Sequence, residues 1–241
     1  MRMEQTFTIR LADLIIRVTT IHDEAHQLCN DYLCDSEERP DIAITTDQAD
    51  IDYERMQDKL GDYEDSYYET LAVYRKIAEK LPRFARLLVH GSAVAIEQRA
   101  WLFMAPSGTG KSTHTRWWRT EFADEHPYMV NDDKPIIGLC EDGVFIYGTP
   151  WDGKEHLSAN VRVPLAAIGL LERSEGDFAE SFPTSEVIPA IMPHVYKPTG
   201  REEALATIET LHRLSDQVAL FRVGVTNSAN AARVTRDAMA T

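Results

Sequence analysis

Short alternating runs of apolar and polar residues mark the first part of the chain, the pattern of strands with one buried face. The runs cover residues 7–10, 14–18 and 41–45. Residues 22–34 are mixed, with a helical tendency. Apolar residues then recur at helical spacing at Leu71, Tyr74, Ile77, Ala78 and Leu81, and Pro82 ends that helix. The pattern predicts a small N-terminal subdomain with a sheet and a linking helix over residues 1–84.

From residue 85 onward, apolar runs alternate with helical segments, which predicts an α/β domain over residues 85–241. The expected strands cover residues 87–89, 93–96, 101–104, 128–130, 163–171 and 218–225. Residues 135–140 and 144–147 flank Asp142-Gly143, a favoured hairpin turn. Helices are expected over residues 202–214 and 228–239, the last with Asn227 or Ser228 as N-cap. Residues 183–200 hold four prolines and are expected to form an irregular crossing.

A glycine-rich stretch, APSGTGKST at residues 105–113, follows the apolar run 101–104 and precedes a segment without Gly or Pro. Strand, Gly-rich turn and helix is the context of a Walker A phosphate loop (P-loop), G-x-x-x-x-G-K-[ST]. Lys111 would reach the β- and γ-phosphates, and the Ser112 hydroxyl would bind Mg²⁺. Ala105 stands where the pattern has Gly. A nucleotide triphosphate site is still favoured over a turn that happens to precede a lysine. The expected nucleotide-binding residues are Ser107, Gly108, Thr109, Gly110, Lys111, Ser112 and Thr113.

Two further stretches carry candidate chemistry. Asp132-Asp133 follow the apolar strand that begins at residue 128. Carboxylates at this end of a strand after a phosphate loop are placed to bind a nucleotide-bound metal. The competing interpretation is a solvated turn, which paired aspartates often form. Residues 148–156 concentrate an aromatic ring, both charge signs and a titratable ring in one loop. We expect Trp151, Lys154 and His156 to contribute to the substrate (acceptor) site. The rival interpretation is a structural loop, with Trp151 covering the edge of the core and Lys154 in water.

The aromatic and histidine residues that follow the glycine-rich stretch also have purely structural interpretations. Trp117 and Trp118 are interpreted as core or interface aromatics rather than as a platform for adenine. His114, on the first turn of the predicted helix, fits contact with the nucleotide or Asp132 no better than it fits capping or packing.

The composition limits which classes of partner are expected. The chain of 241 residues has a formal net charge of −14, and no basic stripe is present, so neither nucleic acid nor a membrane surface is expected as a partner. Cys29, Cys34 and Cys140 have no metal-ligand spacing. Together with an N-terminus that lacks the apolar core of a signal peptide, they indicate reduced thiols in a cytoplasmic protein. The sequence leaves room for a homo-oligomer.

Taken together, His90-Gly91, the loop APSGTGKST and Asp132-Asp133 resemble the catalytic domain of HPr kinase/phosphorylase. More distantly they resemble the nucleotide-binding part of phosphoenolpyruvate carboxykinases. The likeness covers about residues 86–140 and implies a P-loop α/β domain with a mixed sheet. It also implies that one aspartate acts as the base on the accepting serine while the other helps to hold Mg²⁺. By position, Asp132 would be the base and Asp133 the metal ligand, with an exchange of the two left open, and His90 would support catalysis.

The resemblance does not extend to HPr as the acceptor, because residues 148–154 stand where that family has its signature segment. Stand-alone kinases of the superfamily, including those that phosphorylate peptide natural products, are closer analogues. The expected function is a Mg²⁺- and ATP-dependent phosphotransferase acting on a hydroxyl, such as a serine in a peptide, a protein or a small molecule. Two alternatives remain open: a nucleotide-sensing module that hydrolyses slowly or not at all, and a carboxykinase-type lyase.

Overall fold

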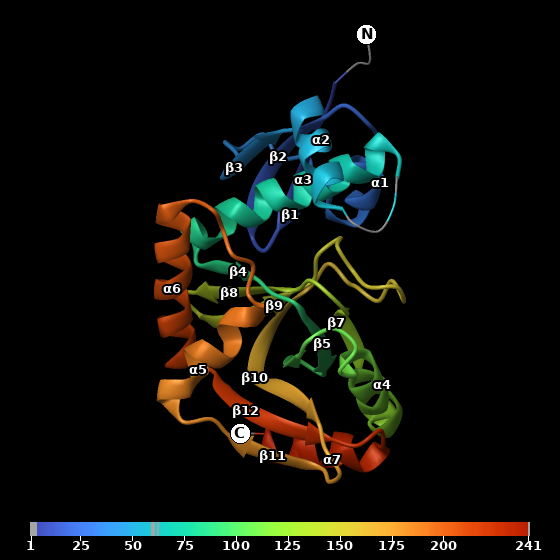
Figure 1. The fold of residues 1–241 in the computed structure, drawn as a ribbon, viewed down its shortest axis with the longest axis vertical. Coiled ribbons are helices and arrows are strands. Elements are labelled where there is room, and N and C mark those ends of the chain that lie inside the picture. Colours follow the sequence, from blue (N-terminus) through green and yellow to red (C-terminus); the bar gives the residue numbers. More distant parts are fainter. Residues whose placement is uncertain (1–3, 59–60, 62, 241) are drawn as a thin grey trace. The chain divides into compact units, whose positions relative to one another are not determined.

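The chain divides into two compact units, Met1–Leu81 and Pro82–Thr241. The computed structural model describes residues 4–58, 61 and 63–240 (Figure 1). The boundary expected from the sequence follows residue 84, close to this division. Among the described residues, no helix is both long and apolar enough to span a bilayer.

The N-terminal unit is built on a three-stranded sheet with the strand order β1-β2-β3. Its elements are β1 (Gln5–Leu11), β2 (Leu14–Thr20), α1 (Glu24–Leu28), β3 (Ile42–Thr45), α2 (Gln48–Gln57) and α3 (Asp65–Lys80). Ala12 and Asp13 connect β1 to β2 with φ of 52° and 66°, the positive values that a tight two-residue hairpin requires. β3 joins β2 in parallel, and α3 packs against β3, α1 and α2. The three strands and the linking helix were therefore predicted correctly, although α3 ends at Lys80 and Pro82 lies in the 3-10 turn Leu81–Phe84 that follows.

A buried carboxylate ties α3 to the ends of two strands in this unit. Glu69 is fully buried and accepts hydrogen bonds from the backbone N–H groups of Ile21 at 2.7 Å and His22 at 2.8 Å. The hydroxyl of Thr46, just after β3, donates to the same carboxylate at 2.5 Å. Because these donors belong to the segments after β2 and β3, Glu69 fixes the helix on the sheet.

The C-terminal unit holds a nine-stranded mixed sheet. Its strands are β4 (Arg86–Leu88), β5 (Gly91–Ile96), β6 (Arg99–Met104), β7 (Tyr128–Asn131), β8 (Ile136–Cys140), β9 (Gly143–Tyr147), β10 (Arg162–Arg173), β11 (Phe178–Ser181) and β12 (Ala219–Val225). β6, β10 and β12 run parallel, and β5, β7 and β11 add to them in antiparallel pairs. The first residues of the long strand β10 turn to pair with β9, which attaches the β8–β9 hairpin and β4.

Helices cover both faces of this sheet. They are α4 (Lys111–Glu121), α5 (Thr184–Ile191), α6 (Arg201–Ser215) and α7 (Ala229–Ala238). Along β6, Leu102 and Met104 enter one apolar cluster while Trp101 and Phe103 enter another, as the strand period of two requires. α5 and α6 contribute to the first cluster, and α4 and α7 to the second (Figure 1). The predicted α/β class and mixed sheet are confirmed.

Two local predictions for this unit were wrong. Residues 184–191, expected to be irregular, form α5 with Pro189 inside the helix. Val187 and Ile191 lie one turn apart and are both buried in the core, and this burial outweighs the helix hydrogen bond that Pro189 cannot donate. β11 was not predicted, because its residues, FAES, are partly or fully exposed and show no apolar alternation.

Candidate active site

The loop between β6 and α4 has the backbone geometry of a phosphate cradle. Gly108 and Gly110 have φ of 78° and 124°, values that residues with a Cβ rarely adopt. A Cβ at either position would meet no atom within 4 Å, so the backbone conformation rather than crowding calls for glycine. α4 begins at Lys111 directly after this turn. The first N–H groups of a helix have no partner inside the helix and favour a bound anion.

Lys111 lies against this loop. Its ammonium donates to the carbonyl oxygen of Ala105 at 2.8 Å, and its side chain is mostly buried. Burial lowers the pKa of Lys111, and the negative charge of Asp133 partly offsets that effect. Lys111 therefore places a positive charge, with few competing waters, between the loop and the aspartate pair.

The two aspartates at the end of β7 have contrasting surroundings. Burial raises the pKa of Asp132, the charges of Asp152 and Asp133 raise it further, and the N–H of Gly153 only partly opposes them by donating at 2.6 Å. Burial would also raise the pKa of Asp133, but His90 and Lys134, each 3.2 Å from its Oδ1, outweigh that effect and lower it. Two neighbouring carboxylates with pKa values pushed apart are suited to separate acid–base roles.

Asn131, the last residue of β7, fixes the turn that carries both aspartates. Its Oδ1 accepts the backbone N–H groups of Asp133 at 2.8 Å and Lys134 at 2.7 Å. Its Nδ2 donates to the carbonyl oxygens of Thr149 at 3.1 Å and Trp151 at 3.3 Å. The side chain is fully buried, so these bonds form without competition from water. Asn131 thus joins the aspartate turn to the loop that was expected to face the acceptor.

That loop comes close to Asp132 at one point. A Cβ on Gly153 would lie 2.7 Å from Oδ2 of Asp132, so only glycine allows the loop to approach this closely. Lys154 and Glu155 follow directly, and Glu155 pairs with Arg116 of α4 at 2.6 Å. His156 turns outward, with a side chain 82% exposed and paired with Asp152 at 3.0 Å.

One pocket of about 510 Å³ brings most of the expected residues together. It is lined by His90, Ser107, Gly108, Gly110, Lys111, Ser112, Thr113, Asp132, Asp133, Gly153, Lys154 and Glu155. Trp151 and His156 are not in its lining. Trp151 contributes its carbonyl oxygen to the bonds of Asn131 and is half-buried. Among the described residues, no group of three or more His, Cys, Asp or Glu side chains is arranged to hold a metal ion.

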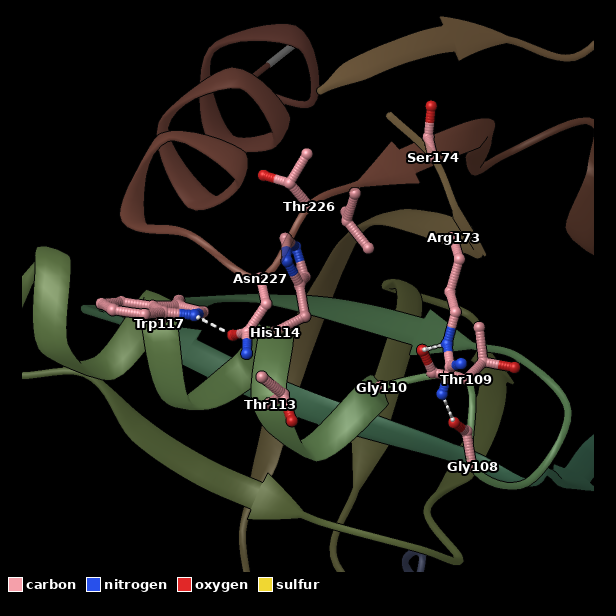
Figure 2. Close-up of a pocket in the computed structure, with 11 residues that line it drawn as sticks. Gly108, Thr109, Gly110, Thr113, His114, Trp117, Arg173, Ser174, Thr226 and Asn227 are labelled. Carbon is pink, nitrogen blue, oxygen red and sulfur yellow. Dashed lines mark hydrogen bonds between the residues drawn. The ribbon is translucent and has the colours of Figure 1, made fainter. Parts of the chain in front are cut away.

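A second pocket of about 500 Å³ shares part of its lining with the first (Figure 2). Gly108, Gly110 and Thr113 line both pockets, and Thr109 lines the second. Its remaining walls are His114, Trp117, Arg173, Ser174, Val225, Thr226 and Asn227. The guanidinium of Arg173 donates to the carbonyl oxygen of Gly108 at 2.7 Å, which braces the loop.

The residues that were not predicted to belong to the site are Asn131, Lys134 and those at the ends of β10 and β12. A usable signal existed for the last group, because the carboxyl ends of parallel strands meet at one edge of a sheet. Arg173 ends β10 and Thr226-Asn227 follow β12, both parallel to the strand that leads into the phosphate loop. No comparable signal marks Asn131, which ends an apolar run.

No protein-family model matches the sequence, and no curated protein matches it. Among solved structures, the chain is similar to the Hpr(Ser) kinase/phosphatase from Coxiella burnetii, with 12% sequence identity and a TM-score of 0.36. The match covers 64% of this chain and 99% of that one. The likeness is distant, so the function proposed below rests on the geometry of the site.

Proposed function

We propose that the C-terminal unit is a Mg²⁺- and ATP-dependent phosphotransferase that transfers the γ-phosphoryl group to a hydroxyl. The observation that carries the proposal is the pocket in which the glycine loop and Lys111 face Asp132 and Asp133. A phosphate cradle alone would fit a nucleotide sensor. The adjacent carboxylates, whose pKa values shift in opposite directions, supply groups for acid–base chemistry, which a nucleotide sensor does not need.

Asp132 is the residue suited to accept a proton. Its donors are backbone amides, Gly153 N–H and its own, and its raised pKa makes it a stronger base than an ordinary aspartate. In the proposed step the acceptor hydroxyl gives its proton to Asp132 and its oxygen bonds to the γ-phosphorus. The bond from the γ-phosphorus to the β–γ bridging oxygen breaks, and ADP leaves with that electron pair.

Asp133 is the residue suited to remain ionised. Its carboxylate and the hydroxyl of Ser112, which lines the same pocket, are oxygen donors of the kind Mg²⁺ takes together with phosphate oxygens and water. A bound Mg²⁺ would neutralise charge on the transferred group. Lys111 and the N–H groups at the start of α4 would position the phosphates. His90 would orient Asp133 through their 3.2 Å contact.

The test is acceptor-dependent transfer. The protein is incubated with γ-labelled ATP, Mg²⁺ and fractions of a cell lysate, and the labelled molecule is identified. Lys111→Ala and Asp132→Asn serve as matched inactive variants. We expect one acceptor to be labelled by the wild type and by neither variant, with the label on a hydroxyl oxygen. Tight ATP binding with no labelled acceptor in any fraction would instead favour a nucleotide-sensing module.

A further inference from the structure

The second pocket lies where a ligand held by the phosphate loop would extend. It shares Gly108, Gly110 and Thr113 with the pocket that holds the aspartates, so the loop and the first turn of α4 form a wall of both pockets. A nucleoside triphosphate is longer than a phosphate cradle. With its terminal phosphate beside the aspartates, the rest of the molecule has to leave the loop, and this pocket is contiguous with it.

An aromatic ring forms one wall. The indole of Trp117, on α4, is half-buried, and its Nε1 donates to Oδ1 of Asn227 at 2.8 Å (Figure 2). This bond fixes the ring between α4 and the segment after β12. A ring held in place loses little conformational entropy when a flat ligand stacks on it. Trp118, the next residue, is instead fully buried in the core, so the adjacent tryptophans have different surroundings.

The side chain of Asn227 offers this pocket an amide donor. Because Oδ1 of Asn227 accepts from Trp117, the Nδ2 group is left to donate, and it has no partner among the described residues. Asp177 holds this segment by accepting the N–H of Thr226 at 2.7 Å and Nδ2 of Asn230 at 2.8 Å. No carboxylate is part of the pocket lining.

His114 adds a buried imidazole to the lining. Its Nε2 lies 3.1 Å from the indole Nε1 of Trp118 and 3.2 Å from the hydroxyl of Thr235, and these two contacts hold the ring in place. The lining therefore combines an aromatic face, a buried imidazole and an available amide donor beside the glycine loop.

From this arrangement we infer that the second pocket receives the purine nucleoside of the nucleotide whose phosphates lie on the loop. Trp117 provides the face for the base, and Nδ2 of Asn227 donates to an acceptor atom on its edge. A purine fits better than a pyrimidine, because its two fused rings match the area of the indole and give a larger stacking surface. The inference rests on the proposed nucleotide site and names the ligand class that the site selects.

The test compares a nucleotide with its phosphate chain alone. Isothermal titration calorimetry in the presence of Mg²⁺ measures the Kd of ATP, GTP, UTP and inorganic tripolyphosphate for the wild type, Trp117→Ala and Asn227→Ala. Asn30→Ala, an exposed asparagine of the N-terminal unit, is the matched control. We expect Trp117→Ala to weaken ATP or GTP about 10- to 100-fold, and Asn227→Ala about 3- to 10-fold, with tripolyphosphate unchanged. UTP should bind the wild type more weakly than either purine.

The outcomes separate this inference from the proposed function. Unchanged purine affinity in a folded Asn227→Ala and Trp117→Ala would overturn the nucleoside pocket and leave the phosphotransferase standing. Equal losses for ATP and tripolyphosphate, or UTP binding as tightly as ATP, would also overturn it. Wild-type protein that binds neither ATP nor tripolyphosphate would overturn both. Asn227 is exposed, so its variant keeps the test valid if Trp117→Ala fails to fold.

Discussion

Glu69 in the N-terminal unit and Asp132 in the C-terminal unit are both buried carboxylates, but their hydrogen-bond partners differ. Glu69 accepts from two backbone N–H groups and the Thr46 hydroxyl, and His22 Nδ1 lies 2.7 Å away. Asp132 has backbone donors only, and two negative charges stand nearby. The first arrangement surrounds the carboxylate with hydrogen-bond partners and holds the fold together. The second leaves a carboxylate that gains by accepting a proton, which is the property a general base needs.

The largest effect is expected from Asp132→Asn. An amide of the same shape cannot accept the proton, so transfer should fall about 10²- to 10⁴-fold while ATP affinity stays near wild type. Steady-state kinetics and calorimetry measure the two quantities. Asp124→Asn, at an exposed carboxylate of the same unit, is the control and should be silent. Unchanged kcat in Asp132→Asn would remove Asp132 as the base.

Glu69→Gln tests the structural side of the comparison. The new amide replaces an acceptor oxygen with a donor facing buried N–H groups, so the free energy of unfolding should drop by about 2–3 kcal/mol. Urea denaturation followed by circular dichroism measures it. The Kd for ATP of the folded protein should not change, because Glu69 is not part of the nucleotide site. A stability equal to wild type would mean that the buried carboxylate contributes nothing net.

The expected effect of Asn131→Ala is on the positioning of the aspartates, and it is smaller than the loss of transfer in Asp132→Asn. The substitution removes the bonds that hold the aspartate turn against the loop after β9, so we expect kcat to fall about tenfold, since small displacements of a catalytic group are costly. The Kd for ATP should change little, because the phosphate loop is untouched. Asn131→Asp keeps the acceptor for the two backbone N–H groups and should recover part of the lost rate if positioning is the cause. No recovery, together with an equal loss of ATP affinity, would indicate general loss of structure.

The pH dependence of transfer tests the source of the raised pKa of Asp132. A protonated Asp132 cannot act as a base, so the rate should fall as the pH drops through its pKa, at a higher pH than an ordinary aspartate would give. Asp152 is one of the charges that raise this pKa. Asp152→Asn should therefore move the acid limb of the kcat profile to lower pH. A limb that stays in place would mean that burial and the charge of Asp133 set the pKa without Asp152.

The stability linkage runs in opposite directions for the two aspartates. The raised pKa of Asp132 favours the folded state at low pH, and that contribution is lost as the pH rises through its folded pKa. The lowered pKa of Asp133 gives stability that is present above its unfolded pKa and is lost as the pH falls through its folded pKa. Asp132→Asn should remove only the first contribution.

The parts of the site that the sequence could predict are local in the chain. The proposed phosphate loop is one contiguous segment between β6 and α4, and its positive φ values at Gly108 and Gly110 favour glycine there. Asp132 and Asp133 directly follow a strand, which limits where they can lie. The second pocket could not be predicted in the same way, because Arg173 and Asn227 join the loop only through the parallel pairing of β10 with β6 and β12. α5 was not predicted either, because four prolines in residues 183–200 indicated irregular structure. The burial of Val187 and Ile191, which stabilises the helix, depends on tertiary packing.

Lys154→Ala is expected to give the smallest effect and addresses the surface that the acceptor meets. Lys154 lines the aspartate pocket next to Gly153, whose N–H donates to Asp132, so we expect its ammonium to meet an acceptor that approaches the proposed base. The side chain is exposed, which limits the worth of any one contact in water. We expect KM for the acceptor to rise about 3- to 10-fold, with the Kd for ATP and the thermal stability unchanged. Lys197→Ala, at an exposed lysine outside the pocket, is the matched control. If both variants show wild-type kinetics for an anionic and a neutral acceptor alike, Lys154 is only a surface lysine. The acceptor must then be recognised by other residues around the pocket.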